Sequence, residues 1–192
     1  RTTNTIDRID TFTIPEVARM MGRGKTYFIS TYGCQANERD SETLAGILDE
    51  LGFTPNETAE GSDVIIINTC AIRQNAEEKV LGEIGNFKRL YRENIDLIIG
   101  VCGCMAQEEG LVETLLTKYP QVRLLFGTHN IQELPSMLYS CMYEGKKVVK
   151  IYSKEGEVYE NLPVHRFGTF KAWVNIMYGC DKFCTYCIVP YT

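Results

Sequence analysis

Short β-branched runs alternate along the chain with longer stretches in which apolar residues recur at helical spacing. The run DVIIIN at residues 63–68 is typical of a strand buried on both faces of a parallel sheet. In contrast, Leu44, Ile47, Leu48 and Leu51 recur every three or four residues, which predicts one apolar helix face. The whole pattern predicts strands at 25–31, 63–68, 96–101, 122–126 and 147–152, and helices at 38–51, 73–91, 107–118 and 131–139. Such alternation predicts an α/β fold with a flavodoxin-like, doubly wound parallel sheet.

The pattern changes after residue 152. Residues 153–170 hold few apolar residues in sequence and several turn formers, which predicts a linker. Residues 171–177 (KAWVNIM) then predict a new strand that leads directly into Cys180, as the first strand of a β/α barrel would. We therefore expect an extension at 1–24, an α/β domain at 25–152, a linker at 153–170 and the truncated start of a barrel at 171–192, with both chain ends incomplete.

Composition narrows the class of protein. The 192 residues are 44% hydrophobic and 23% charged, with neither an apolar run of membrane-spanning length nor a signal peptide, so we expect a cytoplasmic protein without a membrane partner. Disulfide frameworks belong to short, loop-rich secreted domains, so the eight cysteines of this α/β chain favour reduced, metal-binding thiols. The net charge of -5 argues against strong binding of nucleic acid by this segment alone.

Three of the cysteines form the motif CxxxCxxC, at Cys180, Cys184 and Cys187. Three thiolates on one loop can hold three corners of a four-iron cluster and leave the fourth iron without a protein ligand. The ferredoxin run is CxxCxxC with a more distant fourth cysteine, which closes a cluster for electron transfer. The longer first spacing therefore indicates a cluster that takes part in chemistry.

A second set of three cysteines is dispersed in the sequence. Cys34, Cys70 and Cys104 each follow a predicted strand by two or three residues. Because parallel strands end at the same edge of a sheet, where ligands bind in open α/β folds, we expect the three thiols to converge. Each also precedes a predicted helix, whose N-terminal amides favour thiolates and the negative charge of a cluster. Gly33 and Gly103 would allow tight turns beside two of them.

Other metal-site interpretations remain open at this point. A structural zinc ion is the main competitor for either triad, but zinc prefers four ligands and neither triad has an obvious fourth. The only histidines are His129, expected near the same edge in a surface or capping role, and His165. Cys102 and Cys141 are expected to be small buried hydrophobic residues, and Cys102 should point away from Cys104.

Four motifs in this order resemble those of the radical S-adenosylmethionine methylthiotransferases, and the resemblance covers about residues 25–192. In the first motif, Gln35 and Asn37 give the form Gly-Cys-Gln-x-Asn, which is similar to the MiaB-type branch that acts on tRNA. Branches that act on a ribosomal protein or on threonylcarbamoyl-adenosine in tRNA are the alternatives. The motifs are Tyr32-Gly-Cys34-Gln-Ala-Asn37, Asn68-Thr-Cys70-Ala-Ile-Arg73, Gly103-Cys104-Met-Ala-Gln107 and Gly179-Cys180-Asp-Lys-Phe-Cys184-Thr-Tyr-Cys187.

The resemblance implies two 4Fe-4S clusters, S-adenosylmethionine, tRNA as a partner and an electron donor such as flavodoxin or ferredoxin. In such enzymes the cluster on the CxxxCxxC loop reduces S-adenosylmethionine to a 5′-deoxyadenosyl radical, which takes a hydrogen from C2 of N6-isopentenyladenosine beside the anticodon. The auxiliary cluster on Cys34, Cys70 and Cys104 supplies the sulfur of the 2-methylthio product. Most of the barrel and the RNA-binding domain would lie beyond Thr192, so this fragment alone should be inactive.

The resemblance also implies roles for residues beside the cysteines. Tyr186 is similar to a family residue that packs near the adenine of the cofactor; alternatively, it only braces the loop. Gln35, Asn37, Arg73 and Gln107 flank the auxiliary ligands and would donate hydrogen bonds to sulfides or substrate, as contacts that tune cluster potential do. Helix capping is the equal alternative for these four residues.

Two other functional classes stay open. A non-catalytic iron–sulfur or electron-transfer module would need a fourth ligand at each site and would not respond to S-adenosylmethionine. A flavin- or nucleotide-binding domain would need a phosphate-cradling loop after the first strand, and residues 30–37 hold a cysteine and only one glycine.

Overall fold

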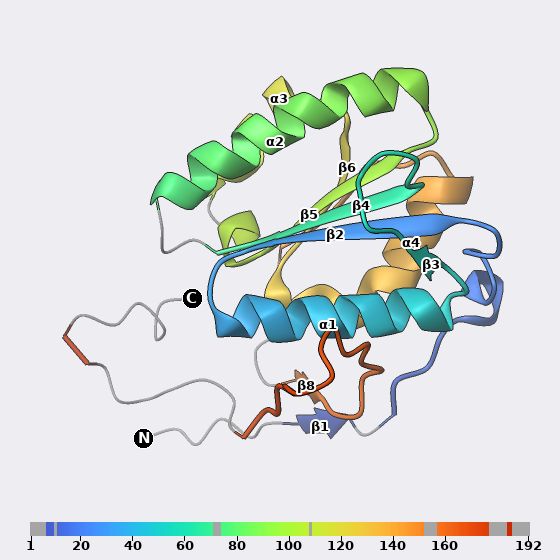
Figure 1. Ribbon diagram of the computed structural model, residues 1–192, viewed down its shortest axis with the longest axis vertical. Helices are drawn as coiled ribbons and strands as arrows, with labels where there is room; N and C mark the ends of the chain where they lie inside the picture. The colour runs from blue at the N-terminus through green and yellow to red at the C-terminus, as the bar shows by residue number, and fades with distance from the viewer. Residues whose placement is uncertain are drawn as a thin grey trace.

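The main body of the protein is a sheet of six parallel strands covered by helices on both faces (Figure 1). The computed structural model describes residues 7–9, 11–70, 74–107, 109–151, 157–176 and 184–185. The strands occur in the order β3-β2-β4-β5-β6-β7. Their bounds are β2 Thr26–Tyr32, β3 Thr54–Pro55, β4 Val64–Thr69, β5 Ile98–Gly103, β6 Val122–Phe126 and β7 Val148–Lys150.

The connections wind the sheet in two directions from β2. The chain leaves β2 through α1 (Gln35–Glu50) to the edge strand β3 and then returns past β2 to β4, so the order reverses between β2 and β4. From there it continues through α2 (Gln74–Glu93), α3 (Glu109–Lys118) and α4 (Leu134–Tyr143) to β5, β6 and β7. This is the flavodoxin-type order with one further strand, and it confirms the predicted α/β class.

Two apolar layers fill the space between the sheet and the helices. On one face Val64 and Ile66 of β4 pack with α1 and α4, and on the other Ile65 and Ile67 pack with α2 and α3. All six residues of β4 are buried, as the continuous apolar run predicts for a central parallel strand. The sheet therefore gives a rigid base to the loops at its carboxyl edge.

Several elements differ in extent from the expectation. Helix α1 begins at Gln35, three residues earlier than predicted, because Cys34 and Asn37 cap a polar first turn that carries no apolar periodicity. Two 3-10 helices, at Cys104–Gln107 and Thr128–Glu133, begin three residues before the predicted third and fourth helices and overlap their first residues. Strand β3 was not expected, since it has two residues, one of them proline.

The strand predicted at residues 171–177 is absent over residues 171–176, the part of it that the structure describes, and no described strand pairs with these residues. The assignment of residues 171–192 to the start of a barrel stays a prediction. A strand needs a neighbour for its backbone hydrogen bonds, and these residues instead lie near the first turn of α1. Upstream, β8 (Glu157–Tyr159) pairs in parallel with β1 (Asp7–Ile9) within the expected linker and extension.

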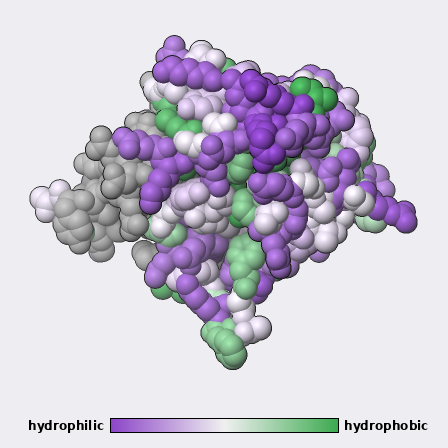
Figure 2. Space-filling model, turned by 45° about the horizontal axis from the view of Figure 1, so that its top comes forward, coloured by the Kyte–Doolittle hydropathy of each residue, from purple (hydrophilic) through white to green (hydrophobic). Residues whose placement is uncertain are grey.

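The N-terminal segment also contributes to the main core. Ala18, the last residue of the 3-10 helix at Glu16–Ala18, and Met21 are buried in the apolar layer of α1 and α4. The outer surface over α2 is mostly hydrophilic (Figure 2). None of the described helices is long and apolar enough to span a bilayer.

Candidate metal centre

Three neighbouring strands bring their final residues into one row at the carboxyl edge of the sheet. Tyr32 of β2 is in register with Thr69 of β4, and Thr69 is in register with Gly103 of β5. Cys70 and Cys104 directly follow this row, and Cys34 follows it by one more residue. Adjacent strands are about 4.8 Å apart. The structure therefore brings Cys34, Cys70 and Cys104 to one edge, although more than thirty residues separate them in sequence.

Two glycines permit this close approach of the cysteine segments. Gly33 has φ +150°, and a Cβ atom placed on it would lie 2.7 Å from Cβ of Cys70. Gly103 has φ +99°, and its Cβ would lie 2.1 Å from the carbonyl oxygen of Thr69. Both backbone conformations disfavour other residues, and any side chain would push the segments apart.

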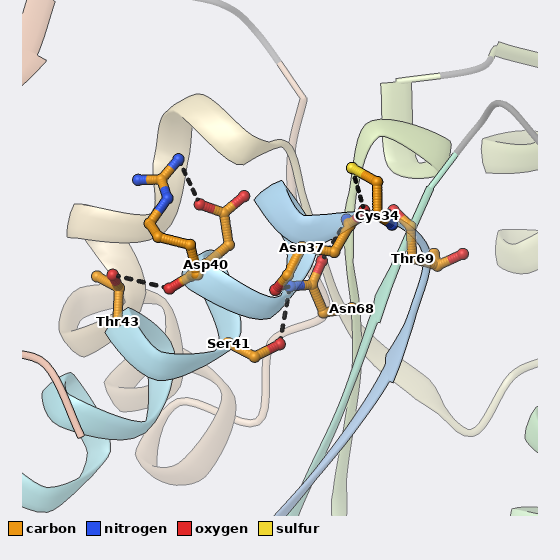
Figure 3. Close-up of polar contacts among 8 residues, drawn as sticks. Cys34, Asn37, Asp40, Ser41, Thr43, Asn68 and Thr69 are labelled. Carbon is orange, nitrogen blue, oxygen red and sulfur yellow. Dashed lines mark hydrogen bonds and ion pairs between the residues drawn. The ribbon is translucent and has the colours of Figure 1, made fainter. Parts of the chain in front are cut away.

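A buried hydrogen-bond network joins the cysteine segments (Figure 3). Oδ1 of Asn37 accepts a bond of 3.1 Å from the backbone amide of Cys34, as in one half of a capping box. Nδ2 of Asn37 donates to Oδ1 of Asn68 at 3.1 Å and to the carbonyl of Thr69 at 3.3 Å. Asn68 in turn donates to the carbonyl of Asn37 at 2.8 Å and to Oγ of Ser41 at 2.9 Å. The network fixes the start of α1 against the end of β4.

Sequence reasoning missed most of this network. Asn68 was named only as part of a motif, and Ser41 and Thr31, whose hydroxyls lie 2.8 Å apart, were not singled out. The available signal was a polar pair, Asn68 and Thr69, that ends an otherwise apolar strand and is fully buried. Buried polar side chains require partners, so such a pair predicts a nearby polar network.

The three thiols differ in their access to solvent. Cys34 is exposed, Cys104 is half-buried and Cys70 is buried. Burial raises the pKa of Cys104 to about 11, and the neighbouring thiols of Cys70 and Cys34 and the carboxylate of Asp40 add to this rise. Thiolates that repel one another in this way are stabilised by a cationic centre. The site is thus open at Cys34 and closed at Cys70.

Three cysteines are a donor set that an iron–sulfur centre can use. Within the described part of the chain, no three Cys, His, Asp or Glu side chains lie close enough together to hold a single metal ion. A four-iron cluster takes each cysteine on a different iron and so needs ligands spread over its faces. Three cysteines on three adjacent strand ends, one of them the N-cap residue of α1, fit that requirement.

The four residues expected to surround the site differ in their positions and contacts. Asn37 has the capping role: both of its N–H groups bond to Asn68 and Thr69, so neither remains for a bound sulfide or substrate. Gln35 is exposed in the first turn of α1. Gln107 ends a 3-10 helix that begins at Cys104, and its side chain is outside what the structure describes. Arg73 lies outside the described residues.

The other candidate ligands lie away from this edge or outside the residues that the structure describes. Cys180, Cys187 and Tyr186 are outside the described residues, and Cys184 is exposed. Cys102 is buried in the layer of α1 and α4 and Cys141 lies in the same layer, as small hydrophobic residues. His129 is exposed in a 3-10 helix, as expected for a surface residue.

His165 contacts Asp49 at the far end of α1 from Cys34. Its Nδ1 lies 2.6 Å from the carboxylate of Asp49 in the last turn of this 16-residue helix. A helix of that length spans about 24 Å. His165 is therefore not a ligand to the site at the sheet edge.

The sequence pattern also gave no indication that Asp40 lies near the site. Its side chain is 6% exposed and forms an ion pair of 2.8 Å with Arg39. Burial raises the pKa of Asp40 to about 6, and the charge of Arg39 lowers it only in part. Asp40 thus places a titratable carboxyl group behind the cysteine edge.

Comparison with known proteins identifies the family to which this chain belongs. The model of the uncharacterized protein family UPF0004 matches residues 26–127, which contain the three cysteines of the sheet edge.

Curated relatives match most of the chain. A protein of Bacillus cytotoxicus (strain DSM 22905 / CIP 110041 / 391-98 / NVH 391-98) is 58% identical over 181 residues, which is 94% of this chain and 36% of the relative. A protein of Geobacillus thermodenitrificans (strain NG80-2) is 56% identical over 187 residues, or 97% of this chain and 36% of the relative. Both are named tRNA-2-methylthio-N(6)-dimethylallyladenosine synthase. The chain therefore spans about a third of the length of these relatives.

Proposed function

Because this chain belongs to the uncharacterized protein family UPF0004, we propose that it is the N-terminal part of a tRNA methylthiotransferase. The whole protein would convert N6-dimethylallyladenosine in tRNA to its 2-methylthio derivative, as the name of its relatives states for them. The observation that supports this most directly is the row of Tyr32, Thr69 and Gly103, which gathers three cysteines at the switch point of the sheet. Ligands bind at that place in open α/β folds.

The described residues would build the holder for an auxiliary cluster. Cys34, Cys70 and Cys104 would be its three protein ligands, and a 4Fe-4S cluster bound there would supply sulfur for the methylthio group. Gly33 and Gly103 let the backbone approach closely enough for the three thiols to share one edge. Exposed Cys34 and buried Cys70 would turn one side of the holder to solvent and to substrate.

Asn37 and Asn68 would keep this holder rigid. Their reciprocal bonds, of 3.1 Å and 2.8 Å, connect α1 with β4, and the second N–H group of Asn37 donates to the carbonyl of Thr69 at 3.3 Å. Preorganised ligands lose less conformational entropy when a metal centre binds. The N-terminus of α1, with Cys34 at its cap, would favour the negative charge of a loaded site.

The CxxxCxxC motif would be the second site. Cys180, Cys184 and Cys187 would hold another 4Fe-4S cluster, and with S-adenosylmethionine and an electron donor this cluster would begin radical chemistry. The division proposed from the sequence assigns residues 25–152 to the sulfur-supplying domain, 153–170 to a linker and 171–192 to the start of a barrel. tRNA binding would depend chiefly on other parts of the protein, because the net charge of this chain is -5.

The proposal is tested by anaerobic iron and sulfide analysis of the full-length protein and of two triple-alanine variants, one for each cysteine set. About eight irons per chain should fall to about four in each variant. Mass spectrometry of nucleosides from tRNA treated with the protein should show 2-methylthio-N6-dimethylallyladenosine for the wild type only.

Each alternative function has its own outcome. Iron that stays near eight without Cys34, Cys70 and Cys104 would remove the auxiliary site. Clusters that can be reduced but do not react with S-adenosylmethionine would favour an electron-transfer module. Methylthiolation of threonylcarbamoyl-adenosine or of a ribosomal protein would assign the protein to another branch of the methylthiotransferases.

A further inference from the structure

Helix α1 is buried around its whole circumference in the middle. Residues 40–48 are all buried, including Asp40, Ser41, Glu42 and Thr43, although only one side of the helix faces the sheet. The side away from the sheet is covered by residues 163–173, which we call the strap (Figure 1). A polar helix side that is covered in this way indicates a specific contact, because buried polar groups need partners.

Backbone-to-backbone contact anchors the strap in the middle of α1. A Cβ atom added to Gly46 would lie 2.4 Å from the carbonyl carbon of Pro163 and 2.5 Å from the amide nitrogen of Val164. The amide of His165 donates a bond of 2.9 Å to the carbonyl oxygen of Glu42. Only glycine at position 46 permits this approach.

Charged contacts continue the strap toward the first turn of α1. Arg166 forms an ion pair with Glu42, whose side chain is only 6% exposed, and also donates to the carbonyl oxygen of Trp173 at 2.9 Å. Glu38 accepts bonds from Nζ of Lys171 at 2.9 Å and from Nε1 of Trp173 at 3.2 Å. The Lys171 ammonium lies 4.1 Å from the centre of the Trp173 ring.

These contacts give the strap a direction. His165 contacts Asp49 near the end of α1, whereas Lys171 and Trp173 contact Glu38 in its first turn. The strap thus runs antiparallel to α1 and ends about one helical turn from Cys34, the N-cap residue. Trp173 precedes Cys180 by seven residues.

We propose that the docked strap positions the CxxxCxxC loop relative to Cys34, with Glu38 and Gly46 as positioning residues. This inference rests on the function proposed above, because it needs two cysteine sites that cooperate. An extended chain spans at most about 3.5 Å per residue, so seven residues keep Cys180 within about 25 Å of Trp173. With the strap released after Leu162, eighteen residues would allow about 63 Å. For a flexible tether, this change lowers the effective concentration of one site at the other about fourfold.

Two variants of the full-length protein release the strap by different means. Gly46→Ala places a methyl group against Pro163, and its control, Gly82→Ala, adds a methyl to an exposed site on α2 with no atom within 4 Å. Glu38→Ala removes the acceptor for Lys171 and Trp173, and its control, Glu113→Ala, removes a carboxylate from exposed α3. Both controls leave the strap untouched.

The first measurement is limited digestion with trypsin, followed by mass spectrometry. Docking protects the bond after Arg166, so Gly46→Ala and Glu38→Ala should speed this cleavage roughly threefold to tenfold relative to cleavage after Lys118. The controls should match the wild type. Unchanged cleavage in both variants would show that the strap is not docked and would overturn the proposal.

The second measurement is the distance between the two reduced clusters by pulsed dipolar EPR, combined with product analysis. The variants should keep the full iron content but show a broader distance distribution and less methylthiolated nucleoside per 5′-deoxyadenosine released. We expect about fourfold less for Gly46→Ala and a smaller loss for Glu38→Ala, which leaves Arg166 paired with Glu42. Faster cleavage after Arg166 with unchanged distance and product ratio would assign the strap a purely structural role. A wild type with a narrow distance distribution and no methylthiolated product would instead count against the proposed function, while supporting the positioning role of the strap.

Discussion

The side-chain amide of Asn37 donates a hydrogen bond of 3.1 Å to the side-chain oxygen of Asn68, and so joins two cysteine segments through their neighbours. Asn37 lies three residues after Cys34, and Asn68 lies two residues before Cys70. Both asparagines are almost completely buried. Their bond therefore transmits the register of the sheet to the first turn of α1.

Asn37→Asp should destabilise the protein, although asparagine and aspartate have nearly the same size and shape. The carboxylate keeps the acceptor for the Cys34 amide but loses both N–H groups and faces two oxygens, those of Asn68 and Thr69. We expect the free energy of unfolding to fall by about 2 to 3 kcal/mol in a denaturant titration.

Asn94→Asp is the matched control for this change. The side chain of Asn94 is exposed and accepts a hydrogen bond from the amide of Asp96. An aspartate at this position can accept the same bond. Its effect should stay within about 0.5 kcal/mol. Equal effects of the two substitutions would show that the Asn37–Asn68 bond does not stabilise the edge.

Gly103→Ala tests the close approach of β5 and β4. The methyl group would meet the carbonyl oxygen of Thr69 at 2.1 Å in a backbone conformation with φ +99°. Gly61→Ala shares the positive φ, at +76°, but has no atom within 4 Å. We expect a loss of about 1 kcal/mol for Gly61→Ala and of at least about 3 kcal/mol for Gly103→Ala. Similar unfolding midpoints for the two variants would contradict the contact.

The sequence predicts the sheet well because its signals are local. The buried run at residues 63–68 and the helical spacing of Leu44 to Leu51 are properties of neighbouring residues, and they determine which elements form. The position of Cys34, Cys70 and Cys104 at one edge then follows from the parallel topology alone.

The strap and the start of α1 could not be predicted in this way. Lys171 and Glu38 are 133 residues apart, and the strap has no apolar period, so no local pattern indicates their contact. The first turn of α1 is polar, and its cap depends on a buried partner, Asn68, from another strand. Such contacts arise from packing between distant segments and are visible only in three dimensions.

Cys102 and Cys104 should respond oppositely to alanine. Cys102 is 1% exposed among the apolar residues of the α1 layer, and burial raises its pKa well above its ordinary value, so it stays a thiol. Cys102→Ala should keep the iron content and lower the free energy of unfolding by about 1 kcal/mol. Cys104→Ala should lower the iron content by up to about four per chain with little change in the stability of the metal-free protein. Iron loss in Cys102→Ala alone would reverse the choice of ligand.

Asp40 should make stability fall as the pH rises. Its pKa is raised from an ordinary 3.8 to about 6, so the folded protein holds this proton more tightly than the unfolded chain does. The resulting stabilisation is complete below about pH 4 and is lost as the pH rises through about 6. At 1.36 kcal/mol per pKa unit, the loss amounts to at most about 3 kcal/mol.

Asp40→Asn isolates this contribution, because asparagine resembles the protonated acid and does not titrate. Other carboxylates, such as Glu38 with its lowered pKa, change stability in the opposite direction, so the difference between variant and wild type is the quantity to measure. Denaturant titrations of the metal-free protein should give nearly equal free energies of unfolding at pH 4. At pH 7.5 the variant should be the more stable by about 2 kcal/mol. A variant that is less stable than the wild type at pH 7.5 would mean that the ion pair with Arg39 outweighs the cost of burying the Asp40 carboxylate.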